Sequence, residues 1–172
     1  MLLSKYIYCL LLLLTFASCS HQKMLVNKAE KSNDKITIFS EDEVGNLYDR
    51  AANLLISQAN KDKTSVILLA TGSTPKKMYA KIIARFAENK SIDFSQLQLF
   101  NLDEYVGLEK GHPLSYQFYM NTLFYDKLRA IDEKRAPRKA NCHIPTVKKG
   151  ESAQNAALRY KNEIASAIRI NK

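Results

Sequence analysis

Ser65-Val66-Ile67-Leu68-Leu69-Ala70, followed by Thr71-Gly72-Ser73-Thr74-Pro75, is the first of two stretches that decide the fold. The second is Leu97-Gln98-Leu99-Phe100-Asn101-Leu102, followed by Asp103-Glu104-Tyr105-Val106-Gly107-Leu108. Each is an apolar run that ends in polar residues. The first run has no polar alternation, as expected of a strand that is covered on both faces of a parallel sheet.

Helical patterns flank both runs. A helix is predicted from Val44 to Ala59, and another after Pro75, a favoured first-turn residue, with Met78, Tyr79, Ile82, Ile83 and Phe86 inward. A strand at Ile36–Phe39 and a capping box at Ser40–Glu43 precede them. This strand–helix alternation predicts an α/β fold, with a parallel sheet and right-handed crossovers between helical layers.

The C-terminal part is expected to contain two further helices joined by a basic loop. The helices run from about Leu114 to Leu128 and from about Glu151 to Ile168, and the loop from Ala130 to Thr146. The inward face of the last helix is predicted to carry Ala153, Ala157, Tyr160, Ile164 and Ile168. The chain ends where the pattern calls for another strand, so the sheet is predicted to be incomplete at the C-terminus.

Charge is unevenly distributed along the 172 residues, a length that suits one domain with a real core. The net charge is +9, and residues 127–172 hold 12 basic against 4 acidic side chains. Such a segment suits nucleic acid, anionic lipid or a phosphorylated substrate, or is simply a solvated surface. Because no basic motif is interleaved with aromatic residues, we expect no nucleic-acid partner.

The N-terminus has the composition of an export signal. Lys5 is followed by an apolar run from Ile7 to Leu14, and the segment ending Phe16-Ala17-Ser18-Cys19 resembles a bacterial lipobox. We expect a signal peptide at 1–18, lipidation of Cys19, a polar tether at 19–34 and the domain at 35–172. The cell envelope is then the predicted location, with membrane contact through the lipid. A signal cut by an ordinary peptidase and an uncleaved anchor are the alternatives.

The cysteines show no metal-binding pattern. Cys9 and Cys19 lie in or at the end of the leader, which leaves Cys142 alone in the body of the chain. We therefore expect no metal site and no cofactor. Cys142 is predicted to be a small buried or half-buried side chain rather than a nucleophile.

The two polar loops have the composition of a sugar-phosphate site. In the first, Gly72 allows close backbone approach, and Ser73 and Thr74 add hydroxyls to the amides of a helix N-terminus, although a plain helix cap has the same form. In the second, Asp103 and Glu104 follow a strand at the carboxyl edge, where a carboxylate serves as a general base or merely caps a turn. A phosphate grip beside a carboxylate base is what proton transfer on a sugar phosphate requires.

Both loops, together with His112-Pro113-Leu114-Ser115-Tyr116, closely resemble glucosamine-6-phosphate deaminase over about Ile36 to Ile168. The resemblance implies a Rossmann-like three-layer fold and conversion of glucosamine 6-phosphate to fructose 6-phosphate and ammonia. By this likeness Gly72, Ser73 and Thr74 bind the phosphate, and Asp103 moves a proton between the second and first carbons of the sugar. Thr71, Glu104 and Tyr105 are candidates for a supporting role.

The family's Gly-x-Gly-x-Asp-Gly-His segment, which supplies the ring-opening histidine, is not among these residues. His21, His112 and His143 do not sit in such a motif. We therefore expect a truncated deaminase-like domain with impaired activity that binds a hexosamine 6-phosphate. The alternative is a non-catalytic envelope lipoprotein that binds a sugar phosphate or a protein. An unpaired strand edge and uncovered apolar helix faces favour self-association.

Overall fold

The computed structural model describes residues 47–109 and 111–170. Along the chain lie α3 (Leu47–Lys61), β1 (Val66–Leu69), α4 (Ser73–Glu88), β2 (Gln98–Asn101), α5 (Tyr116–Met120), a π-helical turn (Asn121–Tyr125), α6 (Asp126–Ile131), a 3-10 turn (Lys139–Asn141), β3 (Cys142–His143) and α7 (Ala153–Ile170). The predicted leader, tether, strand at 36–39 and capping box at 40–43 lie outside the described residues. No helix in the described ranges is long and apolar enough to cross a membrane.

The three strands of the described residues form one parallel sheet in the order β1-β2-β3. Leu69 at the end of β1 pairs with Asn101 at the end of β2, and Phe100 pairs with His143 of β3. The carboxyl ends of β1 and β2 therefore lie side by side. The predicted α/β fold with a parallel sheet is confirmed.

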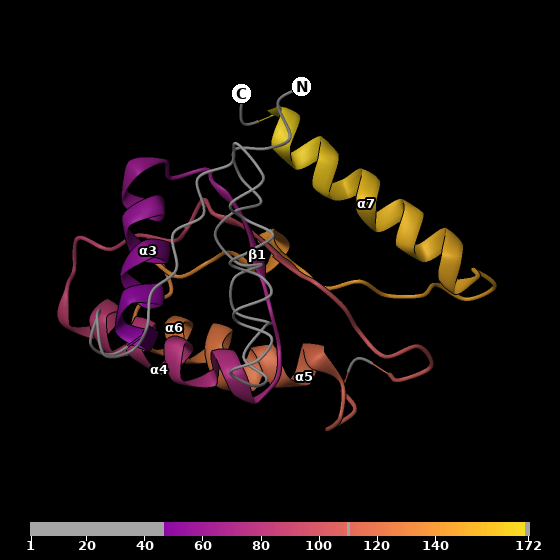
Figure 1. Ribbon diagram of the computed structural model, residues 1–172, viewed down its shortest axis with the longest axis horizontal. Coiled ribbons are helices and arrows are strands. Elements are labelled where there is room, and N and C mark those ends of the chain that lie inside the picture. Colours follow the sequence, from indigo (N-terminus) through magenta and orange to yellow (C-terminus); the bar gives the residue numbers. More distant parts are fainter. Residues whose placement is uncertain (1–46, 110, 171–172) are drawn as a thin grey trace, which may run out of the picture.

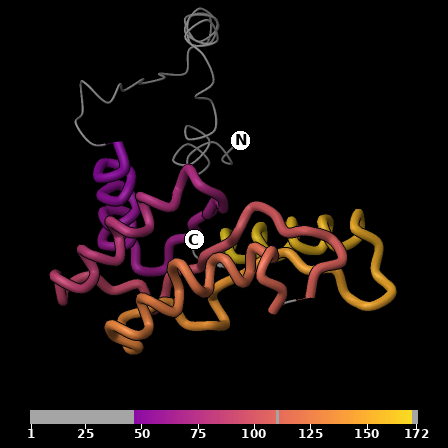
Figure 2. The backbone as a smooth tube through the Cα atoms, turned by 90° about the horizontal axis from the view of Figure 1, so that it is seen from below, coloured from indigo at the N-terminus to yellow at the C-terminus, as the bar shows by residue number. Residues whose placement is uncertain are grey.

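Alternate residues of β2 face two different helical layers. Leu99 belongs to the main apolar core, whereas the next residue, Phe100, packs against Tyr160 of α7 with ring centroids 5.7 Å apart. In Figures 1 and 2, α7 lies apart from the group formed by α3, α4 and α6. The sheet is thus sandwiched between that group and α7, which gives the expected three-layer arrangement.

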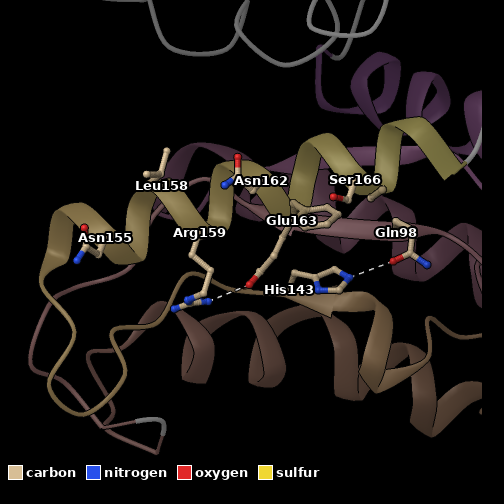
Figure 3. Close-up of a pocket in the computed structure, with 10 residues that line it drawn as sticks. Gln98, His143, Asn155, Leu158, Arg159, Asn162, Glu163 and Ser166 are labelled. Atoms are coloured by element: carbon tan, nitrogen blue, oxygen red, sulfur yellow. Dashed lines mark hydrogen bonds and ion pairs between the residues drawn. The ribbon is translucent and has the colours of Figure 1, made fainter.

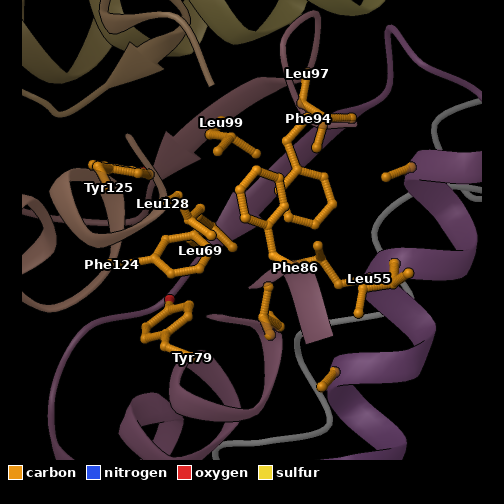
Figure 4. Packing of buried hydrophobic residues seen from close by; sticks show 14 of the residues in the cluster. Leu55, Leu69, Tyr79, Phe86, Phe94, Leu97, Leu99, Phe124, Tyr125 and Leu128 are labelled. Atoms are coloured by element: carbon orange, nitrogen blue, oxygen red, sulfur yellow. The ribbon is translucent and has the colours of Figure 1, made fainter. Parts of the chain in front are cut away.

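The core lies on the α4 side of the sheet (Figure 4). Phe86 of α4 stacks on Phe94 with ring centroids 5.4 Å apart, and Tyr79 packs on Phe124 at 4.6 Å. The inward residues predicted for α4 are buried, apart from Ile83, which is half-buried. Burying a large apolar side chain contributes about 1.5–3 kcal/mol, so this cluster fixes α4 and the loop that precedes it.

One prediction about the C-terminal part is wrong, and another is only partly right. The supposed loop at 130–146 contains the end of α6, a 3-10 turn and β3, because the backbone of Cys142 and His143 pairs with β2. On α7, Tyr160 is buried and Ile164 and Ile168 are half-buried, as predicted, but Ala153 and Ala157 are exposed and Ala156 is buried. The first turns of the helix therefore turn Ala156 inward in place of the two predicted alanines.

Strand β1 is less covered than a strand buried on both faces. Leu69 is fully buried, but Val66, Ile67 and Leu68 are half-buried in the described part of the chain. By register, Val66 and Leu68 lie on the same side of the sheet as Gln98 and Phe100, which α7 covers only in part. The expectation of two covered faces is thus only partly met.

Candidate functional site

The turn between β1 and α4 depends on the backbone of one glycine. Gly72 is the N-cap of α4 and has φ 103° and ψ −169°, a conformation that side-chain-bearing residues rarely adopt. A Cβ atom placed there would meet nothing within 4 Å. The requirement for glycine is therefore conformational and does not arise from crowding.

Two tyrosine hydroxyls hold the carbonyl groups of this turn. Tyr79 of α4 donates to the Ala70 carbonyl oxygen at 2.5 Å, and Tyr119 of α5 donates to the Gly72 carbonyl oxygen. Burial raises the pKa of both hydroxyls, so both are protonated donors at neutral pH. The turn is thus anchored from two separate helices.

The second loop brings its carboxylate to this turn. The backbone N–H of Leu102 donates to the Leu69 carbonyl oxygen at 3.1 Å, which joins the ends of β1 and β2. One residue later, Asp103 is exposed and accepts a hydrogen bond from the Thr71 hydroxyl at 3.5 Å. That distance is long for a hydrogen bond, so it marks proximity more than strength. The structure therefore brings together the two loops that the sequence singles out.

Asn101, the last residue of β2, supports this edge from within. Its side chain is fully buried; the amide donates to the Leu69 carbonyl oxygen at 3.4 Å, and the amide oxygen accepts from the Tyr125 hydroxyl at 3.1 Å. Its own carbonyl oxygen accepts from Tyr160 at 2.8 Å. Asn101 is not among the predicted site residues, although a polar residue inside an apolar run is a visible signal for such a role.

Glu104 makes its contacts with backbone amides. One carboxylate oxygen accepts from the N–H groups of Tyr105 and Tyr116 at 2.9 and 2.8 Å, and the other accepts from the N–H of Gln117 at 2.9 Å. The amides of Tyr116 and Gln117 lie in the first turn of α5. There the Ser115 hydroxyl also accepts a hydrogen bond from the Phe118 N–H. Glu104 therefore ties the Asp103 loop to α5.

Tyr105 lies on the outside of the same loop. Its side chain is 53% exposed, its ring lies 4.9 Å from that of Tyr116, and its hydroxyl accepts from the Tyr116 hydroxyl at 3.3 Å. This hydrogen bond raises the pKa of Tyr116. The exposed apolar side chains of Leu102, Val106 and Leu114 lie in the same part of the chain.

The two histidines in the described ranges are engaged elsewhere. A ring nitrogen of His112 accepts from the Leu114 N–H at 3.2 Å, and His143 pairs with the Gln98 side chain at 3.0 Å on the α7 side of the sheet. Burial lowers the pKa of His143. Within these ranges, neither histidine hydrogen-bonds Asp103.

A separate cavity of about 770 Å³ lies between α7 and the sheet. Figure 3 shows the His143–Gln98 pair on its sheet side and the Arg159–Glu163 ion pair on its α7 side. None of its lining residues belongs to the two loops. This cavity is consequently not the place where the candidate base and the glycine turn meet.

Several basic residues of the C-terminal third serve structure. Arg159 pairs with Glu151 at 3.0 Å and with Glu163 at 2.9 Å, and Arg135 pairs with Asp132 at 2.7 Å.

Among residues 47–109 and 111–170, no group of three or more His, Cys, Asp or Glu side chains is placed to hold a metal ion. Cys142 is half-buried, as predicted, and burial raises the pKa of its thiol to about 11.

These features place the protein in a broad class of α/β proteins. In this class, polar loops meet at the carboxyl edge of a parallel sheet, and ligands bind there. Over residues 40–172 the chain matches the model of a family described as glucosamine-6-phosphate isomerases/6-phosphogluconolactonase. The chain belongs to this family.

Individual relatives agree with the assignment. The chain is 43% identical over 94 residues to a glucosamine-6-phosphate deaminase of Shewanella loihica, covering 55% of this chain and 32% of that protein. It is 35% identical over 121 residues to a Clostridium botulinum glucosamine-6-phosphate deaminase, covering 70% and 45%.

The fold has a solved counterpart. A structure described as a monomeric glucosamine-6-phosphate deaminase superposes with a TM-score of 0.60 at 27% identity, over 76% of this chain and 49% of that one. The chain thus spans between 32% and 49% of the length of these relatives. The family resemblance seen in the two loops is confirmed.

Proposed function

We propose that the Thr71–Thr74 turn and Asp103 form the phosphate-binding and proton-transfer parts of a glucosamine-6-phosphate deaminase site. The reaction is glucosamine 6-phosphate plus water to fructose 6-phosphate plus ammonia. The observation that carries the proposal is the contact between the Thr71 hydroxyl and the Asp103 carboxylate, 3.5 Å apart. It joins the loops that follow two neighbouring strands.

The glycine turn supplies the groups that a phosphate needs. It opens α4, a helix of 16 residues, whose first amides have no acceptor within the helix and point towards the turn. The helix dipole adds a partial positive charge there, and Ser73 and Thr74 are exposed with hydroxyls as further donors. A phosphomonoester dianion is the ligand that these groups favour.

In this proposal, Asp103 acts on the sugar beside that phosphate. In the open-chain substrate, its carboxylate takes the proton from the second carbon and returns it to the first. In the same step a proton passes from the nitrogen to the aldehyde oxygen, so the aldehyde carbon becomes a hydroxymethyl carbon and the amine becomes an imine at the second carbon. Water then hydrolyses this imine to the ketone and ammonia. A positioned carboxylate of this kind contributes general-base catalysis.

We expect turnover by the 172-residue polypeptide to be slow. Opening the sugar ring requires a proton donor at the ring oxygen, and the two described histidines make their hydrogen bonds with Leu114 and Gln98. Catalytic groups that act as a set depend on one another, so most of the rate is lost when a proton donor is held away from the ring oxygen. Ammonia release from glucosamine 6-phosphate measures this. Rapid turnover that Asp103→Asn abolishes would contradict the expected impairment.

Calorimetric titration tests the binding part of the proposal. Glucosamine 6-phosphate should produce heat that glucosamine does not, because the turn recognises the phosphate. Gly72→Ala should remove this heat, since alanine resists a φ of 103°. Gly111→Ala is the matched control: its added Cβ also meets open space, and Gly111 has no positive φ. Indistinguishable heats for the two sugars would overturn the proposal.

A further inference from the structure

Tyr119 connects α5 to the glycine turn across 47 residues of sequence, through the hydrogen bond from its hydroxyl to the Gly72 carbonyl oxygen. The side chain is half-buried, and burial raises the pKa of its hydroxyl. Gly72 is also the residue with the unusual backbone conformation, at the N-cap of α4. Tyr119 therefore acts on the one peptide unit that joins the turn to the helix.

The geometry of a peptide unit gives this bond a consequence for the ligand site. In a planar trans peptide, the C=O and the following N–H point in opposite directions. The unit that carries the Gly72 carbonyl also carries the N–H of Ser73, the first residue of α4. By drawing the carbonyl towards α5, Tyr119 directs the Ser73 N–H away from α5, to the outer side of the turn.

The position of Tyr119 is in turn set by the loop of the candidate base. Glu104 and Ser115 hold the first turn of α5 through its backbone amides, and Tyr119 lies in the next turn. The Ser115 carbonyl oxygen also accepts from the Tyr119 N–H at 3.0 Å. Contacts from the Asp103 loop thus reach the glycine turn through α5.

We propose that Tyr119 is a positioning residue that orients the Ser73 N–H towards a bound phosphate. The inference rests on the proposed function, because the phosphate is the group that the amide would meet. Tyr119 itself does not touch the ligand. Without the hydroxyl, the Gly72–Ser73 peptide loses its anchor and samples other orientations, so the amide is less often directed at the anion.

The test compares Tyr119→Phe with the wild-type chain of 172 residues. Phenylalanine keeps the ring and removes only the hydroxyl. We expect the Kd for glucosamine 6-phosphate, measured by calorimetry, to rise about fivefold, the scale of one ordinary hydrogen bond. In ¹⁵N–¹H spectra, the ligand-induced shift of the Ser73 amide should shrink. A purely structural role would lower the melting temperature without changing this shift.

Ser65→Ala is the matched control. It also removes one hydroxyl that donates to a backbone carbonyl, that of Asp62, but at the start of β1, the end opposite to the turn. Its Kd should equal that of the wild type. If Tyr119→Phe binds as well as the wild type, Tyr119 is not a positioning residue and the proposed function stands. If the wild type itself shows no phosphate-dependent binding, both the inference and the proposed function fail.

Discussion

Glu104 is adjacent to the candidate base, yet its contacts serve the backbone. Its two carboxylate oxygens accept three N–H groups, two of them in the first turn of α5. A negative charge at a helix N-terminus is favourable, and hydrogen bonds to an ionised group are stronger than neutral ones. Glu104 thus contributes to stability and, through α5, to the placement of Tyr119.

Replacing Glu104 with glutamine should lower the free energy of unfolding by about 1–2 kcal/mol, because the amide offers one neutral acceptor in place of two charged oxygens. Urea denaturation of both chains measures the difference. Glu133→Gln, which changes an exposed side chain in the same way, serves as the control and should have little effect. Equal losses of unfolding free energy in the two variants would show that the Glu104 hydrogen bonds to α5 add no stability.

At the residue scale, roles that depend on neighbouring residues in the sequence could be predicted, and roles that depend on contacts with distant residues could not. Gly72 and Asp103 were predictable because a glycine before a helix and an acid after a strand are patterns within a few residues. Tyr119 was not, since its partner lies 47 positions away and nothing near it in sequence marks the contact. Phosphate binding by the Thr71–Thr74 turn and proton transfer by Asp103 stay predictions.

At the level of elements, periodicity predicted α4, β1 and β2, because their apolar spacing is strong. It missed β3, whose two residues are too few to show alternation and which exists through pairing with β2. It also gave one continuous helix where the chain forms α5, a π-helical turn and α6. Such a turn depends on how Phe124 and Tyr125 pack in the core, which the spacing alone does not encode.

The start of α7 should give the protein a pH-dependent stability. Hydrogen bonds from the Arg159 guanidinium, and from the Lys148 N–H, lower the pKa of Glu151 to about 2. Because this value lies below the 4.5 expected for an unpaired glutamate, the unfolded chain binds the proton first as the pH falls. The contribution of Glu151 is therefore complete above pH 4.5 and is lost on acidification towards pH 2.

Chemical denaturation between pH 7 and pH 2 measures this contribution. The wild type should lose stability more steeply below pH 4.5 than Glu151→Gln, which cannot titrate. Glu88→Gln, at the exposed end of α4, should keep the wild-type slope. Parallel curves for the wild type and Glu151→Gln would mean that the Arg159 pair does not persist in solution.

For the whole molecule, the proposed location depends on the N-terminal segment, which lies outside the described residues. We predict that residues 1–18 are removed and that Cys19 carries lipid, because the apolar run ends in small residues before a cysteine. Metabolic labelling with a fatty-acid probe in a bacterial host should mark the wild type and not Cys19→Ala. Equal labelling of both chains would exclude this anchor.

Among the described residues, the edge where the β1 and β2 loops meet is separate from the cavity beneath α7. The proposed function depends on this edge of the sheet. The parallel register places the Thr71–Thr74 turn and Asp103 side by side, whereas the α7 cavity is lined by other residues. A ligand that carries a phosphate should therefore bind at the edge and not in the α7 cavity.

The most direct test is a ¹⁵N–¹H titration of the assigned protein with glucosamine 6-phosphate, and with glucosamine as the control. We predict phosphate-dependent shifts centred on the amides of Gly72, Ser73 and Thr74, extending to Asp103, and no such shifts with glucosamine. Shifts confined to the residues around His143 and Asn162 in the α7 cavity, or equal shifts with both sugars, would contradict this prediction.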